Sequence, residues 1–140
     1  MRVVLDTDVL VAALRSNLGA SRVLLSAALD REFELLLSVP LVIEYEAVIT
    51  RPEQLKASGL TKAEAVAVLD ALVAVAEPIR LSFRWRPLLA DPADDMVLET
   101  AVNGGADILV TFNHRHFRSA ARQFEVQISG SGEALDRLRG

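Results

Sequence analysis

Short apolar segments alternate with segments of helical character along the chain, and this alternation constrains the fold more than any other feature. The segments predicted to be strands are residues 2–5, 33–37, 78–81, 108–111 and 124–128. Strands that alternate with helices form a parallel sheet with helices on both faces. We therefore predict an α/β fold with three layers, α/β/α, around a central parallel sheet of four to five strands.

The helices predicted between these strands are residues 7–14, 21–29, 40–50, 61–75, 94–104 and 133–138. Pro40 suits the first turn of a helix, and the pair Arg51-Pro52 predicts where that helix ends. Thr61 and Glu64 have the spacing of a capping box. The pair Gly104-Gly105 predicts the end of the helix that begins near Asp94.

Composition limits the classes of protein that this chain can belong to. Its 140 residues predict a single domain over residues 1–140, and 51% hydrophobic residues argue against disorder. The absence of cysteine excludes a disulfide framework and a cysteine nucleophile. No apolar stretch approaches the length of a membrane span, and the early Asp6 argues against a signal peptide. We expect a soluble, cytoplasmic protein without a membrane partner.

The net charge of −4 argues mildly against a nucleic-acid partner. However, cations bound to the acidic residues would make a site attractive to phosphate. Arginine is dense late in the chain, at Arg80, Arg84, Arg86, Arg115, Arg118 and Arg122. Arginines of this kind can bind phosphate, although solvated surface charge is the simpler explanation for any one of them.

Polar side chains stand where the predicted apolar segments end. Asp6 and Asn113 follow strands, Glu44 lies one turn into a helix, and Asp94 opens another helix. Ligands bind at the carboxyl ends of parallel strands, where these side chains can meet. Converging carboxylates repel one another, and a divalent cation relieves that repulsion. The pattern predicts a site for Mg²⁺ or Mn²⁺ whose candidate ligands are Asp6, Glu44, Asp91, Asp94, Asp95 and Asn113.

Most of these side chains also have a simpler explanation. Asp6, Asp94 and Asn113 could each cap a helix, the last of them a short one at residues 114–117. Asp91 before Pro92 could belong to a turn. Glu44 is the hardest to dismiss, because it lies within an apolar run. A metal site is the one explanation that covers Asp6, Glu44, Asp94 and Asn113 together.

The aromatic and imidazole side chains carry weaker signals. His114 and His116 are predicted to be surface or phosphate-contacting groups, because no third histidine exists to complete a metal site. Phe83 and Trp85 could stack on a base, although burial in the core is the simpler interpretation.

Four segments resemble the PIN-domain ribonuclease family: VLDTDVLV at 4–11, EYEAVITR at 44–51, DPADDMVLE at 91–99 and ADILVTFN at 106–113. The resemblance extends from residue 2 to about residue 128, and it is closest to the VapC-like toxins of toxin–antitoxin modules. It implies that Asp6, Glu44 and Asp94 are the family's first, second and third acids. Asn113 stands where the family has Asp or Asn.

Three residues beside these positions also bear on the resemblance. Asp8 departs from the Asn or Ser that is usual there, so the sequence leaves its role open. Thr7 and Thr111 sit beside the acids and could form hydrogen bonds with them.

The resemblance implies a metal-dependent endoribonuclease, in which a water bound to Mg²⁺ or Mn²⁺ attacks an RNA phosphodiester. One ion or two could take part. It also implies a toxin with a cognate antitoxin, and we expect a homodimer. The apolar helices at 21–29 and 61–75 are candidates for either protein contact.

Two other functions stay open. A phosphatase or nucleotide hydrolase would use the pair Asp6-Thr7-Asp8, with Asp6 as covalent nucleophile. That chemistry also needs a later lysine, and none occurs after Lys62. A non-catalytic PIN-fold binding module is the third possibility, against which the full set of acids speaks.

Overall fold

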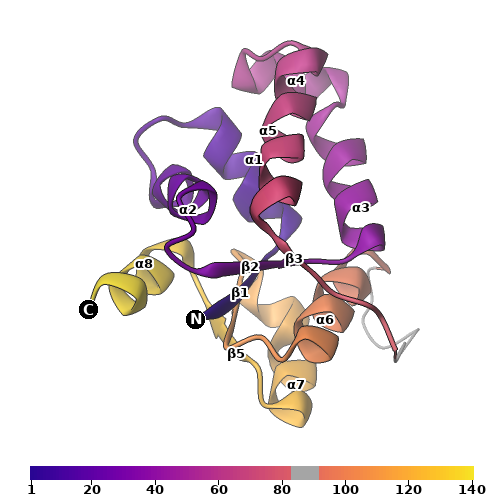
Figure 1. The fold of residues 1–140 in the computed structure, drawn as a ribbon, viewed down its shortest axis with the longest axis vertical. Coiled ribbons are helices and arrows are strands. Elements are labelled where there is room, and N and C mark those ends of the chain that lie inside the picture. Colours follow the sequence, from indigo (N-terminus) through magenta and orange to yellow (C-terminus); the bar gives the residue numbers. More distant parts are fainter. Residues whose placement is uncertain (83–91) are drawn as a thin grey trace.

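The structure, a computed structural model, describes residues 1–82 and 92–140 and is built around a five-stranded parallel sheet (Figure 1). Its strands are β1 (Arg2–Leu5), β2 (Glu34–Leu37), β3 (Glu77–Pro78), β4 (Ile108–Val110) and β5 (Gln127–Ser129). They lie in the order β3-β2-β1-β4-β5, and each pairs in parallel with its neighbours. The predicted fold class is confirmed.

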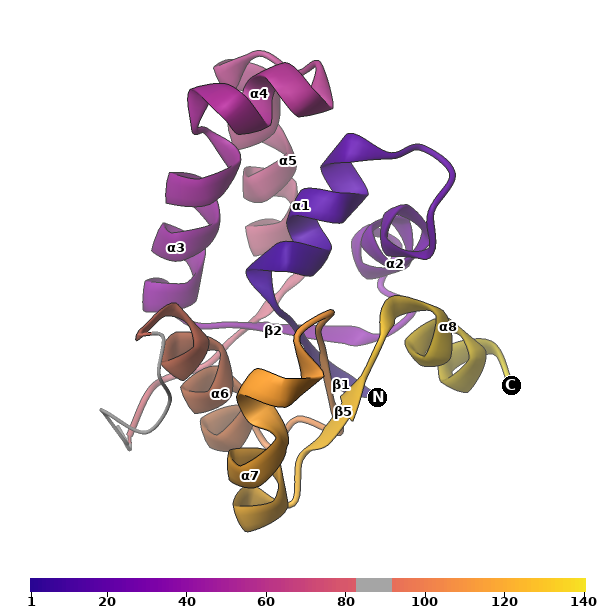
Figure 2. The same cartoon turned by 180° about the vertical axis from the view of Figure 1, so that it is seen from behind.

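Helices cover both faces of this sheet. The helices of the described residues are α1 (Thr7–Arg15), α2 (Ala20–Leu29), α3 (Val39–Ile49), α4 (Pro52–Ser58), α5 (Lys62–Val75), α6 (Pro92–Gly104), α7 (His114–Phe124) and α8 (Ser131–Arg139). Figures 1 and 2 show α1 to α5 on one side of the sheet and α6 and α7 on the other, with α8 beside α2. The result is the predicted three-layer arrangement.

The three middle strands form the centre of the core. Their nearly inaccessible apolar residues are Val3, Val4, Leu5, Leu35, Leu36, Leu37, Ile108, Leu109 and Val110. Continuous apolar runs of this kind are typical of parallel strands that helices cover on both faces. Because β1 pairs with β4 from Val3 to Leu5, the two strands end side by side, and the backbone N–H of Asp6 donates to the carbonyl of Val110 at 2.8 Å.

The predicted stop at Gly104-Gly105 is confirmed, and each glycine is needed for a different reason. A Cβ on Gly104 would lie 2.8 Å from Leu36 Cδ1, and the Gly104 carbonyl accepts hydrogen bonds from the Arg2 guanidinium at 2.9 and 2.7 Å. Gly105 has φ of 61°, a left-handed conformation that favours glycine after a helix.

The edge strand β3 is shorter and earlier than the predicted 78–81. It pairs only with Leu36 and Leu37 of β2, after which the backbone N–H of Ile79 donates to the Leu37 carbonyl at 2.8 Å. Pro78 has no N–H to contribute, and proline is tolerated in such an edge position.

Several predicted helix boundaries are wrong. Pro52 does end the preceding helix, but it also opens α4, which the sequence analysis did not predict. The prediction that Asp94 or one of its neighbours caps α6 is wrong for Asp94 itself, because that helix already begins at Pro92 and has Asp94 in its first turn. Helix α7 continues to Phe124 rather than ending at residue 117, so the last strand starts at Gln127 instead of residue 124.

Among the described residues, no single helix is long and apolar enough to cross a membrane. Helices α1 and α2 meet that criterion only when taken together, and they are bent by 103° relative to each other.

Candidate metal centre

A cavity of about 300 Å³ lies at the carboxyl edge of the sheet. It is lined by Asp6, Thr7, Asp8, Val11, Glu44, Val48, Gln54, Asp94 and Asn113. The fold thus brings together four of the candidate ligands, Asp6, Glu44, Asp94 and Asn113, from four separate parts of the chain.

Asp6 follows β1 and uses both carboxylate oxygens. Its Oδ1 accepts a hydrogen bond from the backbone N–H of Thr7 at 2.8 Å and so caps α1, as the simpler explanation proposed. Its Oδ2 accepts a bond from Thr111 Oγ1 at 2.7 Å, which confirms the expected threonine contact. Capping and cavity lining coexist, since the same carboxylate lies at the end of β1 and at the start of α1.

Asp8 holds the other side of the cavity. Its Oδ2 accepts hydrogen bonds from the backbone N–H of Phe112 at 3.1 Å and from Asn113 Nδ2 at 2.9 Å. Its Oδ1 is buried and has no hydrogen-bond partner among the described residues. The Asn113 side chain is therefore turned toward Asp8, while the Asn113 carbonyl accepts the N–H of His116 at 3.0 Å.

The two carboxyl groups near β1, those of Asp6 and Asp8, both have raised pKa values. Burial raises the pKa of Asp6, although hydrogen bonds from Thr111 and Thr7 oppose the rise. Burial, and next the charge of Asp6, raise the pKa of Asp8 to about 7. Beneath them the buried Tyr45 hydroxyl donates to the Leu5 carbonyl, and burial raises the pKa of that hydroxyl as well.

Glu44 and Asp94 reach the cavity from opposite layers. Glu44 is half-buried on α3, whereas Asp94 is 7% exposed on α6. His116 Nδ1 lies 2.9 Å from Asp94 Oδ2, an ion pair when the imidazole is protonated. His116 is exposed, as the sequence predicts, but its contact with Asp94 could not be predicted because it depends on how α6 packs against α7.

Asp95 and Asp91 are the two remaining candidate ligands. Asp95 is 3% exposed and is not among the described residues that line the cavity. Asp91 lies outside the described residues, as do Phe83, Arg84, Trp85 and Arg86. Conversely, Gln54 was missed because it comes from the unpredicted helix α4.

The donors around the cavity fit a hard divalent cation. All of them offer oxygen, and Mg²⁺ prefers oxygen ligands. The unpartnered Asp8 Oδ1 and the raised pKa values of Asp6 and Asp8 indicate that nearby positive charge would stabilise the site. Within residues 1–82 and 92–140, no three acidic or histidine side chains are close enough to surround an ion as they stand. An ion that keeps several waters needs only one or two direct carboxylates.

The raised pKa of Asp8 predicts how the stability of the metal-free protein depends on pH. Its folded-state pKa of about 7 exceeds the ordinary value of 3.8, so the native state holds a proton that the unfolded chain releases. This stabilisation is complete below about pH 4 and is lost as the pH rises through about 7. We expect the Tm of the wild type, relative to Asp8→Asn, to fall across that range in chelator.

Differential scanning fluorimetry of both proteins over the same pH series checks this. Carboxyl groups with lowered pKa values, such as Glu64 and Glu77, contribute equally to the pH dependence of Tm in both proteins, so their contribution cancels in the comparison. Added Mn²⁺ should restore the Tm most at high pH, because it binds the ionised carboxylate. A Tm difference that stays constant with pH would contradict the prediction.

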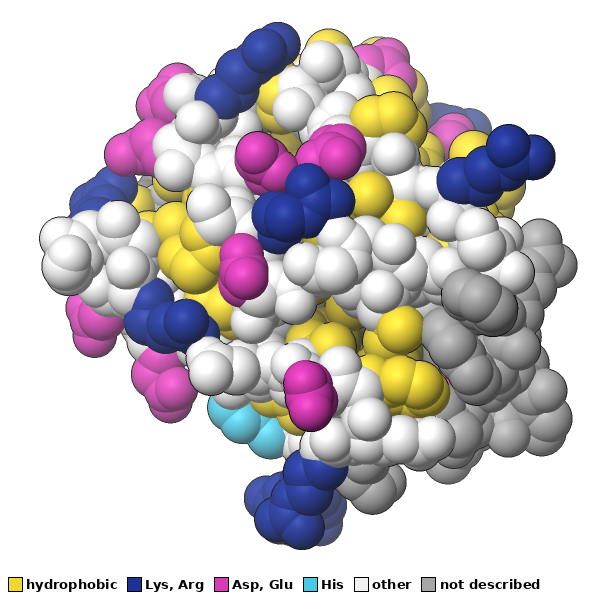
Figure 3. Space-filling model, turned by 60° about the horizontal axis from the view of Figure 1, so that its bottom comes forward, with side chains coloured by type: hydrophobic (Ala, Val, Ile, Leu, Met, Phe, Trp, Pro, Cys, Tyr) yellow, Lys and Arg dark blue, Asp and Glu magenta, His cyan; other side chains and the backbone are white. Residues whose placement is uncertain are grey.

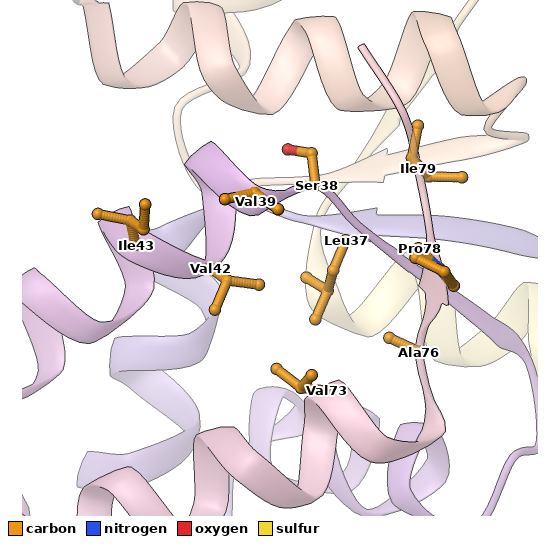
Figure 4. Close-up of a pocket in the computed structure, with 9 residues that line it drawn as sticks. All are labelled: Leu37, Ser38, Val39, Val42, Ile43, Val73, Ala76, Pro78 and Ile79. Atoms are coloured by element: carbon orange, nitrogen blue, oxygen red, sulfur yellow. The ribbon is translucent and has the colours of Figure 1, made fainter.

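A second hollow, of about 400 Å³, is apolar and lies on the same side of the sheet as α3 and α5. Figure 4 shows Val39 and Ile43 of α3 and Val73 of α5 around it, with Pro78 and Ile79 on its opposite side. It contains no acidic or basic side chain, so it offers nothing to a cation.

The fold and the acidic cavity define a three-layer α/β/α protein with its polar site at the carboxyl edge of a parallel sheet. A family model of the PIN domain matches residues 2–115, and the chain belongs to the PIN domain family. This confirms the resemblance noted in the sequence.

One solved structure with a similar fold is that of VapBC2 from Rickettsia felis bound to a DNA fragment from their promoter. The match has a TM-score of 0.62 and 16% sequence identity, and it covers 93% of this chain and 98% of that chain. At this identity the likeness concerns the fold. None of the curated proteins compared with the chain matches it.

Proposed function

We propose that the protein is a metal-dependent endoribonuclease that hydrolyses RNA phosphodiesters. One observation carries the proposal: the cavity at the carboxyl edge of the sheet gathers Asp6, Glu44, Asp94 and Asn113. The first three match the acids of the PIN family, Asn113 stands where the family has Asp or Asn, and the chain belongs to that family. Fold likeness alone would leave the function open, because unrelated activities share folds.

Some residues of the cavity would hold a metal ion, and others orient those ligands. Asp6, Glu44, Asp94 and Asn113 would hold Mg²⁺ or Mn²⁺. A bound ion supplies an acidified water and neutralises charge on the phosphoryl oxygens. Thr111 fixes the direction of the Asp6 carboxylate through the bond at 2.7 Å, and Asp8 holds the Asn113 amide through the bond at 2.9 Å.

The biological role that we propose is that of a toxin in a toxin–antitoxin module, with a cognate antitoxin as protein partner. The fold likeness to VapBC2 supports this role, because the crystal of that protein contains the VapBC2 assembly. We also propose a homodimer. Of the two helices named as contact candidates, α2 buries much of its apolar surface, whereas Val73 of α5 is 46% exposed. Val39 and Ile43 of α3 are exposed beside Val73, around the apolar hollow described above. We therefore assign the protein contact to this hollow.

Cleavage of RNA with and without chelator tests the proposed chemistry. We expect cleavage with Mg²⁺ or Mn²⁺ and none in excess EDTA. Glu44→Gln should lower the rate by at least about a hundredfold, a loss typical of removing one stabilising group from an active site. Glu46→Gln is the matched control, because Glu46 is exposed on the same helix and does not line the cavity. Full activity in EDTA, or equal effects of the two variants, would overturn the proposal.

A further inference from the structure

Helix α7 presents a stripe of arginines to solvent. Arg115, Arg118 and Arg122 are exposed, and their spacing of i, i+3 and i+7 places them along one side of the helix. The opposite side holds Phe117, which is completely buried. No acidic residue occurs between Asp107 and Glu125, although the chain as a whole carries a net charge of −4. Positive charge is therefore concentrated on this helix.

Surface hollows connect the stripe to the acidic cavity. A hollow of about 390 Å³ is lined by Phe112, Asn113, His114, Arg115, His116 and Arg118. It shares Asn113 with the acidic cavity. A further hollow of about 410 Å³ shares His114 and Arg118 with it and extends past Arg122 to Gln127 on β5, with Glu125 at its border. An extended ligand in the acidic cavity can thus continue along α7.

Arg115 and Arg118 have no structural role among the described residues, whereas Arg122 lies in the last turn of α7, where positive charge complements the helix dipole. In the described parts of the chain, none of the three forms an ion pair or a side-chain hydrogen bond. Cations near a helix N-terminus also oppose the helix dipole, so Arg115 in the first turn of α7 raises an already positive potential. An anion bound there would pair with these arginines and would also lower the positive potential at the start of α7.

Figure 3 shows a face of the molecule that includes part of this helix. The only histidines of the chain, His114 and His116, are both on α7, so the cyan atoms mark it, and a group of dark-blue side chains protrudes below them. An acidic side chain, in magenta, lies just above this group, and elsewhere on this face positive and negative side chains are mixed. Phe112, which is 52% exposed at the start of the stripe, adds an aromatic surface on which a base can stack.

We propose that the outer side of α7 is the track along which single-stranded RNA leaves the acidic cavity. Backbone phosphates contact Arg115, Arg118 and Arg122, and one base stacks on Phe112. The proposal rests on the proposed function, since it assigns a position to the substrate of the same site. An acidic protein segment would match the charge, but the exposed aromatic ring beside the cavity favours a nucleic acid.

Binding of a labelled single-stranded RNA, measured by fluorescence anisotropy over a salt series, tests the track. The Asp6→Asn protein serves as the background so that cleavage does not interfere. Log affinity falls as log salt rises, and each phosphate contact contributes about 0.7 to the steepness of that fall. The triple variant Arg115→Gln, Arg118→Gln, Arg122→Gln should therefore make the slope less steep by about 2. Phe112→Ala should weaken binding by about tenfold without changing the slope.

The matched control replaces three exposed arginines elsewhere, Arg31, Arg80 and Arg139, by glutamine. It has the same net charge and should leave the slope nearly unchanged. In cleavage-competent protein, Arg122→Gln should raise KM and spare kcat, because Arg122 does not line the acidic cavity.

Equal slopes of log affinity against log salt for the stripe variant and the control would overturn the track. So would a stripe variant that binds RNA as tightly as the parent but loses affinity for a poly-glutamate peptide. Failure of the track and failure of the proposed function are distinguishable. RNA that is cleaved but insensitive to the stripe refutes the track alone, whereas RNA bound along the stripe but never cleaved refutes the function alone.

Discussion

Replacing Asp6 by asparagine is expected to reduce metal-dependent RNA cleavage by at least about a hundredfold while leaving the protein folded. Asp6 is the buried acid at the end of the central strand, and both of its oxygens are oriented by hydrogen bonds from Thr7 and Thr111. Asparagine keeps the shape but removes the charge. Since burial raises the pKa of Asp6, losing that charge also removes a cost of folding the metal-free protein.

Cleavage rates and Tm values of the wild type and Asp6→Asn, each with and without Mn²⁺, check this result. The Tm in chelator should not fall, and the stabilisation by Mn²⁺ should be lost. Asp70→Asn, at an exposed position on α5, is the control. Retention of most of the activity by Asp6→Asn would remove Asp6 from the mechanism, and a phospho-enzyme in the wild type would favour the phosphatase alternative.

Replacing Phe117 by alanine is expected to destabilise the protein by about 3–5 kcal/mol, a large part of the stability of a typical domain. Phe117 is fully buried and anchors α7 to the core. The cavity left behind would not be refilled, since α7 is held at its start by the bonds of Asn113.

Urea denaturation of Phe117→Ala measures the loss. Phe112→Ala is a matched control, because it removes the same side chain at a position that is 52% exposed and should cost far less. Similar destabilisation by both variants would show that α7 is not anchored in this way.

The sequence predicted best where one local pattern decided the structure. The strands β1, β2 and β4 are short apolar runs that bury both faces, and the box at Thr61 and Glu64 has both of its hydrogen bonds. Helix α4 was missed because Pro52 can end one helix and begin the next, and the local pattern does not separate the two roles.

Parts of the candidate site could not be predicted, because they arise from packing between distant segments. The position of Asp8 depends on Phe112 and Asn113, more than 100 residues away. The pair of His116 and Asp94 depends on the approach of α7 to α6. The gathering of Asp6, Glu44, Asp94 and Asn113 was predictable from the rule that parallel strands end at one edge and from the resemblance to the PIN family.

The pairing of β1 with β4 also determines when, during synthesis of the chain, the candidate site can form. Asp6 is translated early, but its partner Thr111 follows 105 residues later, and β1 has no neighbour on that side until β4 has left the ribosome. Contacts of such large sequence separation form late in folding. If the protein is the ribonuclease proposed above, a nascent chain that ends before residue 108 would therefore lack the complete site and would leave the surrounding RNA intact.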